Sequence, residues 1–114
     1  MSDCLFCDIV ARTLPATIVH DDGAVLAIRD INPQAPVHVL VLPHEHIESA
    51  ATLTAAHDGL WAQMLHMAQA IARDEGIEQS GYRLLTSIGR DGGQTVPHLH
   101  LHLLGGRHMM WPPG

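Results

Sequence analysis

Residues 98–104 have the sequence HLHLHLL, a strict alternation of histidine and leucine. In a β-strand successive side chains point to opposite faces, so residues two apart share a face. The motif therefore predicts a strand over residues 98–104 whose leucines pack into a core and whose three histidines form one wall of a site. The motif alone leaves two other interpretations open. One is an amphipathic strand with a histidine-rich polar face, and the other is a zinc site built from alternating histidines.

The flanking segments predict an α+β fold. Residues 37–42, VHVLVL, are apolar on both faces except at His38, which predicts a central strand covered on both sides. Residues 54–75 carry apolar side chains at helical spacing and predict one long helix. Shorter elements are expected as a helix within residues 4–12 and as strands at residues 17–20, 24–29 and 82–88. Together they predict a mostly antiparallel sheet packed on one main helix, in a single domain over residues 1–114.

The charge balance argues against a protein that binds nucleic acid or a membrane. All six basic residues are arginines, and the formal net charge is −6. A binder of a nucleic-acid backbone or of an anionic membrane surface needs a basic face, which this acidic chain does not supply. Ten histidines in 114 residues are a large excess. Because histidine changes charge near neutral pH and binds metals, this excess points to chemistry.

A glycine-rich turn precedes the histidine motif. Residues 89–95 read GRDGGQT, and glycines let a backbone approach a ligand and present N–H groups to an anion. Such a turn alone is weak evidence, because hairpins use the same residues. A glycine-rich turn that leads into a strand with three histidines indicates a site for a phosphate group much more strongly.

These motifs resemble the signature of the histidine-triad (HIT) superfamily. Residues 92–106, GGQTVPHLHLHLLGG, look like the triad, and residues 30–38, DINPQAPVH, resemble the nucleoside-binding loop and strand of that family. Residues 105–114 are similar to the end of the Hint branch, so the similarity covers nearly the whole chain. The resemblance implies the HIT fold and a homodimer with the long helix at its interface. It also implies a nucleotide hydrolase or transferase that works through a nucleotidyl-histidine intermediate.

The resemblance assigns roles to four histidines. His100 matches the nucleophile of the family, and a neutral imidazole is a competent nucleophile near pH 7. His102 would donate to a phosphate oxygen, and His38 would orient the nucleophile. From its strand alone, His38 could equally be a core histidine with satisfied hydrogen bonds. His98 completes the catalytic set, but it could not act as a free acid if it binds a metal.

The resemblance also implies where the substrate binds. Asp30 would hydrogen-bond the ribose hydroxyls, and Ile31 would line the base pocket. Backbone N–H groups of Gly93, Gln94 and Thr95 would stabilise charge in the transition state, and the Thr95 hydroxyl would lie near the leaving group.

Two further substrate contacts are expected outside this loop. Ser87 stands where the Hint pattern usually has asparagine, so the contact made there differs from the usual one. Trp111 belongs to the C-terminal tail, which the resemblance places near the site of the partner subunit in a homodimer.

A pair of cysteines raises the question of a metal. Cys4 and Cys7 have C-x-x-C spacing, which is compatible with a redox pair, half of a zinc site or chance. Some HIT proteins complete a zinc site with two histidines, which correspond here to His46 and His98, and His44 is a nearby alternative. The resemblance therefore implies a structural Zn²⁺ site with tetrahedral coordination, and no organic cofactor is expected.

The activity implied by the Hint-like tail is cleavage of the P–N bond of a purine nucleoside 5′-phosphoramidate, such as adenosine 5′-phosphoramidate. Two alternatives remain. One is another HIT activity, such as a dinucleoside polyphosphate hydrolase or a nucleotidyl transferase, and the other is a nucleotide-binding module with vestigial turnover. The first residues lack the pattern of a secretory leader, and the cysteine pair suits a reducing compartment, so we expect a cytoplasmic protein.

Overall fold

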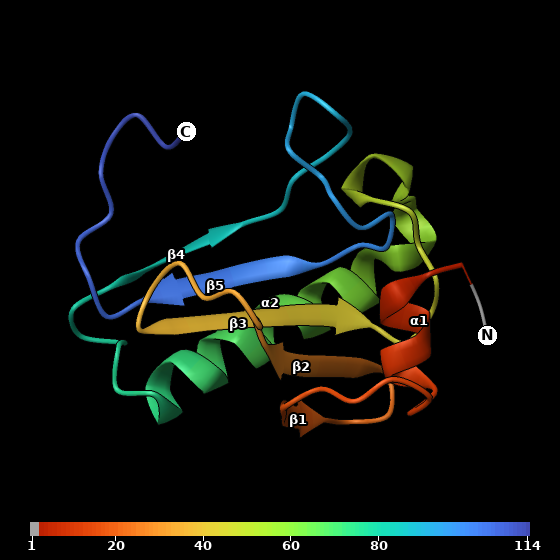
Figure 1. Cartoon of the computed structure of the whole chain (residues 1–114), viewed down its shortest axis with the longest axis horizontal. Coiled ribbons are helices and arrows are strands. Elements are labelled where there is room, and N and C mark those ends of the chain that lie inside the picture. The colour runs from red at the N-terminus through yellow and green to blue at the C-terminus, as the bar shows by residue number, and fades with distance from the viewer. Residues whose placement is uncertain (1–2) are drawn as a thin grey trace.

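Five strands form one antiparallel sheet in the computed structural model, which describes residues 3–114 (Figure 1). The strands are β1 (Ile18–Asp21), β2 (Val25–Arg29), β3 (Val37–Pro43), β4 (Tyr82–Leu85) and β5 (Leu101–Gly105), in the spatial order β1-β2-β3-β5-β4. The helices are α1 (Leu5–Val10) and α2 (Asp58–Asp74), and two short 3₁₀ turns, Ala50–Thr52 and Ala55–His57, precede α2. The α+β fold with a central β3, one long helix and a short N-terminal helix is as the sequence predicts.

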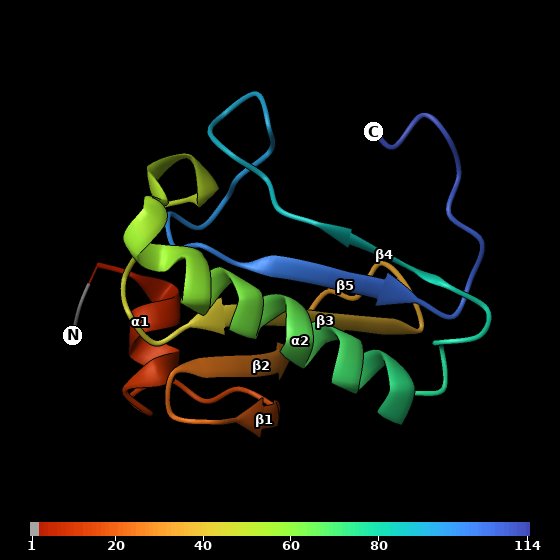
Figure 2. The same cartoon turned by 180° about the vertical axis from the view of Figure 1, so that it is seen from behind.

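The alternation of side chains divides the core into two layers. The odd-numbered side chains of β3, such as Val39 and Val41, pack with Leu101 and Leu103 of β5 against the buried face of α2. The even-numbered side chains, such as Leu40, lie on the opposite face and pack with α1. Figure 2 shows α2 running across the sheet, whereas α1 covers only one end of the other face. Part of that other face therefore stays available for a site.

The long helix begins later than its sequence pattern predicts. Residues 55–57 form a 3₁₀ turn, in which the Thr54 N–H donates to His57 Nδ1 at 3.0 Å, and the regular helix starts at Asp58. Met64, Met67 and Ile71 are buried at helical spacing, as expected. The helix ends before Gly76, whose φ of 74° is the left-handed conformation that glycine adopts at helix ends.

The histidine motif is less regular than a complete strand. The expected strand over residues 98–104 begins only at Leu101, because Leu99 donates its N–H to the Ile47 carbonyl at 2.6 Å and leaves the β-ladder. The expected strand over residues 82–88 likewise ends at Leu85. Just beyond it the Thr86 hydroxyl donates to the His100 carbonyl at 2.7 Å, which replaces a backbone bond of the ladder. Within residues 3–114, no helix combines the length and the apolar character needed to cross a membrane.

Candidate active site and metal cluster

Pairing between β3 and β5 brings two histidines together on the face opposite α2. The register places Leu40 beside His102, and His38 lies two residues before Leu40, so His38 and His102 are diagonal neighbours on one face. His38 Nε2 lies 2.9 Å from His102 Nδ1. His38 therefore belongs to the histidine site, and the alternative of an isolated core histidine does not apply.

Hydrogen bonds determine which nitrogens of these two rings carry a proton. The Gln34 N–H donates to His38 Nδ1 at 3.0 Å, so a neutral His38 has its proton on Nε2. That Nε2–H donates to His102 Nδ1, which places the proton of a neutral His102 on its own Nε2. Asp30 Oδ2, 3.4 Å from His38 Nε2, is a second acceptor for the same proton. His102 thus has an N–H available as a hydrogen-bond donor.

In His100 the ring proton is on Nδ1, whereas in His38 and His102 it is on Nε2. The Nδ1 of His100 lies 2.7 Å from the His98 carbonyl oxygen, and because a carbonyl only accepts, Nδ1 carries the proton and Nε2 has the lone pair. The Phe6 ring packs edge-on against the His100 ring with centroids 5.0 Å apart, and the ring itself is buried. His100 therefore offers an unprotonated nitrogen in a fixed orientation, beside the N–H of His102.

Both rings line a cavity of about 520 Å³. Most of its other walls are apolar, and they come from α1, the segment after it, the sheet and the segment that leads into β5: Leu5, Phe6, Ile9, Leu14, Pro15, Ala16, Ile28, Leu40 and Val96. Asp30 and Ile31 line it from the loop after β2, and Thr95 lines it from the glycine-rich turn. A mostly apolar hollow with a few polar groups beside two histidines is the usual form of a small-molecule site.

Burial keeps the two hydrogen-bonded histidines neutral. Desolvation, followed by the neighbouring His100 and His38 rings, lowers the pKa of His102 to about 4. Desolvation also lowers the pKa of His38, and the Asp30 carboxylate opposes this shift. Both rings are therefore neutral at pH 7, which is the state in which the arrangement of protons described above holds.

A second group of side chains gathers at the end of the sheet beside α1. Sγ of Cys4 lies 3.3 Å from His98 Nδ1, Sγ of Cys7 lies 3.2 Å from His46 Nδ1, and the two Nδ1 atoms are 3.3 Å apart. His98 Nε2 donates to the Pro43 carbonyl at 2.9 Å, so the Nδ1 lone pair faces the sulfurs. Burial and the neighbouring Cys4 raise the pKa of the Cys7 thiol to about 11, so Cys7 keeps its proton at neutral pH unless a cation stabilises the thiolate.

This cluster could bind a metal ion. The four donor atoms lie within 4.8 Å of one another, and two thiols with two imidazoles are a donor set that suits tetrahedral Zn²⁺. His98 has its second nitrogen held by a backbone carbonyl, which is the usual way in which proteins orient a metal-binding histidine. His44, the alternative ligand considered from the sequence, instead pairs with Asp21 Oδ1 at 2.7 Å.

Asp30, His38 and His102 also have donor atoms within 4.8 Å of one another, but their geometry is that of a hydrogen-bonded chain. His38 Nε2 and His102 Nδ1 are 2.9 Å apart, a normal hydrogen-bond length. Two ligands at about 2.0 Å from a tetrahedral ion lie roughly 3.3 Å apart, and their lone pairs must point to the ion and not at each other. This group therefore has the geometry of a hydrogen-bonded chain, whereas the cysteine-containing cluster could bind a metal.

Comparison with known proteins agrees with this geometry. The family model described as the HIT domain matches residues 11–109, which is most of the chain. The chain belongs to the HIT family. A solved structure described as a HIT family hydrolase from Legionella pneumophila shares 47% sequence identity and has a TM-score of 0.97, with 98% of this chain and 100% of that chain covered.

Relatives of this HIT chain carry different descriptions. An uncharacterized HIT-like protein of Synechococcus elongatus is 49% identical over 98% of this chain and 97% of its own. A purine nucleoside phosphoramidase of Escherichia coli K12 is 45% identical over 90% of this chain and 87% of its own. A 14 kDa zinc-binding protein of Zea mays is 43% identical over 99% of this chain and 89% of its own.

The HIT fold brings together only some of the residues predicted from the sequence. Asp30, Ile31, Thr95, His100 and His102 all line the cavity, and His38 is hydrogen-bonded to His102 behind it. His98 is fully buried and outside the cavity lining, with both ring nitrogens engaged elsewhere. His98 therefore does not line the cavity, because its ring lies against Cys4 and Phe6 of the N-terminal segment. Leu99, Leu101 and Leu103 all pack on the α2 side of the sheet, so the predicted alternation of faces holds although only two of the three histidines reach the cavity.

Four other predicted contacts lie away from the cavity lining: Ser87, Gly93, Gln94 and Trp111. Gln94 instead organises the glycine-rich turn, since its side-chain amide donates to the Glu48 carbonyl at 2.7 Å and accepts from the Gly89 N–H at 3.0 Å. Trp111 is 81% exposed in this single chain.

Sequence reasoning did not anticipate three contacts of the site: Phe6 against His100, Gln34 against His38, and Thr86 on the His100 carbonyl. Only the order of residues in the DINPQAPVH motif, which keeps Gln34 four positions before His38, could have pointed to one of them. The other two join segments that are far apart in the chain.

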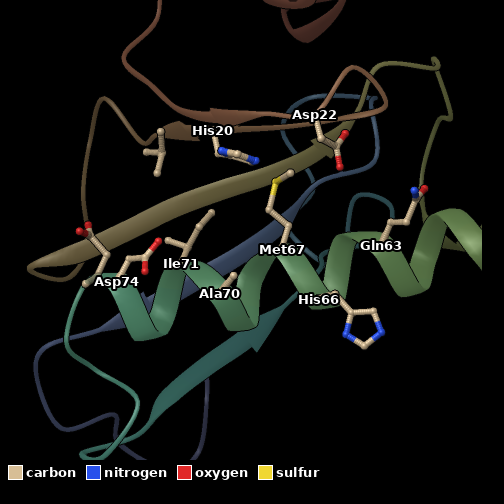
Figure 3. A pocket seen from close by; sticks show the side chains of 10 residues that line it. His20, Asp22, Gln63, His66, Met67, Ala70, Ile71 and Asp74 are labelled. Carbon is tan, nitrogen blue, oxygen red and sulfur yellow. The ribbon is translucent and has the colours of Figure 1, made fainter.

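A second hollow, of about 390 Å³, lies between β1 and α2 (Figure 3). Met67 and Ile71 of α2 extend toward His20 of β1 across it. Two of its carboxylates already have partners, since Asp22 accepts from backbone N–H groups of the β1–β2 turn and Glu75 pairs with Arg29. Among residues 3–114, the two clusters of converging metal-ligand side chains lie outside this second hollow.

Proposed function

We propose that this HIT-family chain is a nucleotide hydrolase that cleaves the P–N bond of purine nucleoside 5′-phosphoramidates through a nucleotidyl-His100 intermediate. The proposal rests on which ring nitrogens of the two cavity histidines, His100 and His102, carry a proton. The hydrogen bond of His100 Nδ1 to the His98 carbonyl leaves Nε2 as the nucleophilic nitrogen, and His102 presents an N–H beside it. The similarity to the E. coli purine nucleoside phosphoramidase supports the choice of substrate.

In the first step, His100 Nε2 attacks the α-phosphorus. A new P–N bond forms to His100, and the P–N bond to the amine breaks as the departing nitrogen takes up one proton from solvent and leaves as the neutral amine. The imidazole ring becomes cationic as the bond forms, and the His98 carbonyl that accepts from Nδ1–H stabilises this charge. The His102 Nε2–H donates to a non-bridging phosphate oxygen, which stabilises the transition state.

In the second step, water attacks the phosphorus of the adduct. A P–O bond forms to the water oxygen, the bond between phosphorus and Nε2 breaks, and the nucleoside 5′-monophosphate is released. One proton of the water passes to solvent, and His100 returns to its neutral form. Covalent catalysis of this kind replaces one difficult displacement with two easier ones. Thr95 lines the cavity, and its hydroxyl would contact the leaving amine or the water that follows it.

The cavity suits a nucleoside. Ile31, with 97% of its surface exposed at the rim, offers an apolar side chain for a purine base. Asp30 Oδ1 accepts from the Asn32 N–H at 2.8 Å, which orients the carboxylate at the cavity wall, where it can bind the ribose hydroxyls. Arg29 is the one lysine or arginine among the described residues that line the cavity. Because Arg29 already pairs with Glu75, the phosphate contacts fall to the histidines, the Thr95 hydroxyl and backbone N–H groups.

We also propose that Cys4, Cys7, His46 and His98 bind a structural Zn²⁺. The name of the maize relative, a zinc-binding protein, supports this ion. When bound, zinc would keep both thiols deprotonated and hold the N-terminal segment against the residues before β5. His98 would then connect the metal cluster to the reaction, because its ring faces the cysteines and its carbonyl holds His100 Nδ1.

The proposed biological unit is a homodimer. Met110 and Trp111 are large apolar side chains that stay mostly exposed at the C-terminal tail, at 69% and 81%. Such exposure is costly for a free tail, and a partner subunit would bury these side chains near its own site.

We expect the purified protein to hydrolyse adenosine 5′-phosphoramidate to AMP and ammonia, with at least about tenfold higher kcat/KM than for a dinucleoside polyphosphate. The physical reason is that the apolar cavity is sized for one nucleoside and has few cations for a polyphosphate chain. Release of ammonia and of nucleotide would be measured on the same preparation. Preference for the polyphosphate would favour the alternative HIT activity, and binding without turnover would favour a nucleotide-binding module.

The low pKa values of His38 and His102 predict a loss of stability in acid. Their pKa values in the folded protein lie below the ordinary value of 6.5, and that of His102 is about 4. As the pH falls below about 6.5 the unfolded chain takes up protons that the folded chain does not, so the free energy of unfolding decreases until His102 is protonated near pH 4. Above about pH 7 the two rings are neutral in both the folded and the unfolded chain. Their contribution to the free energy of unfolding is then at its full value and no longer changes with pH.

Urea unfolding at a series of pH values tests this expectation. The variant His102→Asn should lose less stability than the original protein between about pH 6.5 and about pH 4.5, and the two curves should run parallel above about pH 7. Parallel curves over the whole range would show that the pKa of His102 is not lowered by folding.

A further inference from the structure

Arg107 connects the segment after β5 to the loop that precedes β3. Its Nε donates to the Gln34 carbonyl at 3.0 Å, and its Nη1 donates to the His108 carbonyl at 3.0 Å. Arg12, Arg29 and Arg90 each pair with a carboxylate, and Arg107 is absent from the ion pairs formed within residues 3–114. In a chain with twelve acidic residues, this guanidinium is instead used to hold two backbone carbonyls.

A close backbone contact joins the same two segments. Gly106 has a φ of 87°, and a Cβ atom added there would lie 2.9 Å from Cβ of Pro36. Glycine is therefore required both by the backbone conformation and by the approach of Pro36. The loop of residues 30–36 is thus held at two points by residues that directly follow β5.

Gln34, whose carbonyl Arg107 holds, acts together with Asp30 in setting the proton position of His38 in the active site. The Gln34 N–H donates to His38 Nδ1 at 3.0 Å and so keeps the proton of His38 on Nε2. If this N–H moved away, His38 could carry its proton on Nδ1 and present a lone pair at Nε2. His102 would then have to protonate Nδ1 to keep its 2.9 Å contact with His38, and its Nε2 would become an acceptor. A lone pair on His102 Nε2 would repel a phosphate oxygen. The transition state would therefore lose the hydrogen bond that the His102 N–H donates.

We propose that Arg107 is a positioning residue for this site: by holding the Gln34 carbonyl it keeps the Gln34 N–H on His38 Nδ1 and thereby fixes the proton of His102 on Nε2. The consequence for turnover rests on the proposed function, in which His102 donates to the phosphate. The effect of Arg107 on the proton positions of His38 and His102 is independent of the proposed function. A guanidinium suits this task because its planar fork holds two carbonyls from different segments at once, which an ammonium on a flexible stem does less well.

The test compares Arg107→Ala and Arg107→Lys with Arg83→Ala. Arg83 is a matched control, because it is also an arginine that donates to a backbone carbonyl of the tail, that of Met110 at 3.0 Å, and this bond does not involve the 30–36 loop. The first measurement is the ¹⁵N spectrum of the histidine rings at about pH 7.5, where protonated and unprotonated ring nitrogens have different shifts. The second is kcat and KM with adenosine 5′-phosphoramidate.

We expect His38 and His102 to be protonated on Nε2 in the original protein and in Arg83→Ala, and to show mixed proton positions in Arg107→Ala. Loss of one oriented hydrogen bond costs about 1.4 kcal/mol, so kcat should fall about tenfold in Arg107→Ala with KM within about twofold. Arg107→Lys should recover only part of kcat.

Two results would overturn the proposal. One is an Arg107→Ala protein whose ring spectrum and kcat match the original. The other is the same change of proton positions in Arg83→Ala, which would assign the effect to the tail in general. If Arg107→Ala shifts the ring protons but the original protein does not turn over the phosphoramidate, the positioning role stands and the proposed function fails.

Discussion

Replacing His100 with alanine is expected to abolish hydrolysis of adenosine 5′-phosphoramidate, with kcat lowered at least about 10³-fold. The loss should be this large because the variant removes the nitrogen that forms the covalent bond, so no other group can divide the reaction into two displacements. The cavity itself should persist. His100→Ala is therefore expected to bind AMP with an affinity within about tenfold of the original, which calorimetry can measure.

A second measurement distinguishes the nucleophile from a residue that only supports the site. A rapid quench in alkali, followed by mass spectrometry of the peptide that contains His100, should detect the added nucleotide in the original protein and not in the variant. The matched control is His20→Ala, which removes a histidine from the edge strand β1, far in sequence from the triad. Full activity in His100→Ala, or an adduct on another histidine, would contradict the assignment of His100.

Replacing Cys4 with serine is expected to remove bound zinc and to destabilise the protein. A tetrahedral site that loses one of two thiolates binds zinc far more weakly, and the binding free energy of a structural metal contributes to folding. We expect less than about 0.2 equivalents of zinc in the variant. A destabilisation of about 3 kcal/mol would lower the Tm by roughly 10–15 °C for a chain of this size. Metal analysis and thermal unfolding on chelator-free preparations measure the two effects.

The neighbouring His44 provides the control for this experiment. It follows β3 as His46 does, but it pairs with Asp21 and lies outside the cluster, so His44→Ala should retain a full equivalent of zinc. Because the His98 carbonyl holds His100 Nδ1, we also expect Cys4→Ser to lower kcat more than His44→Ala does. Stoichiometric zinc in Cys4→Ser, or no zinc in the original protein, would refute the metal site.

The alternation of HLHLHLL and the apolar run VHVLVL were sufficient to predict two core strands, and the spacing of Met64, Met67 and Ile71 predicted the long helix. These predictions succeed because side-chain periodicity is a local property, set by the geometry of strand and helix. The predicted boundaries of the strands were less accurate. Residues 98–100 do not continue the regular strand, because the Leu99 N–H bonds to Ile47, a partner more than fifty positions earlier that no local pattern indicates.

The sequence by itself also indicated which residue types carry the chemistry, because an ordinary polar strand face has no need of three alternating histidines beside a glycine-rich turn. The resemblance to the HIT family implied a role for each of them, but only the tertiary structure decided which contacts they make. The register between β3 and β5 places His38 diagonally beside His102, and the packing of separate stretches of chain brings Cys4 and Cys7 to His46 and His98.

Proton positions likewise depend on single contacts, such as the Gln34 N–H with His38 and the His98 carbonyl with His100. These contacts are set by strand register and by the packing of distant segments. Both depend on long-range burial, which the spacing of residues along the chain does not contain, so the residue types of the site follow from the sequence and their contacts follow from the fold.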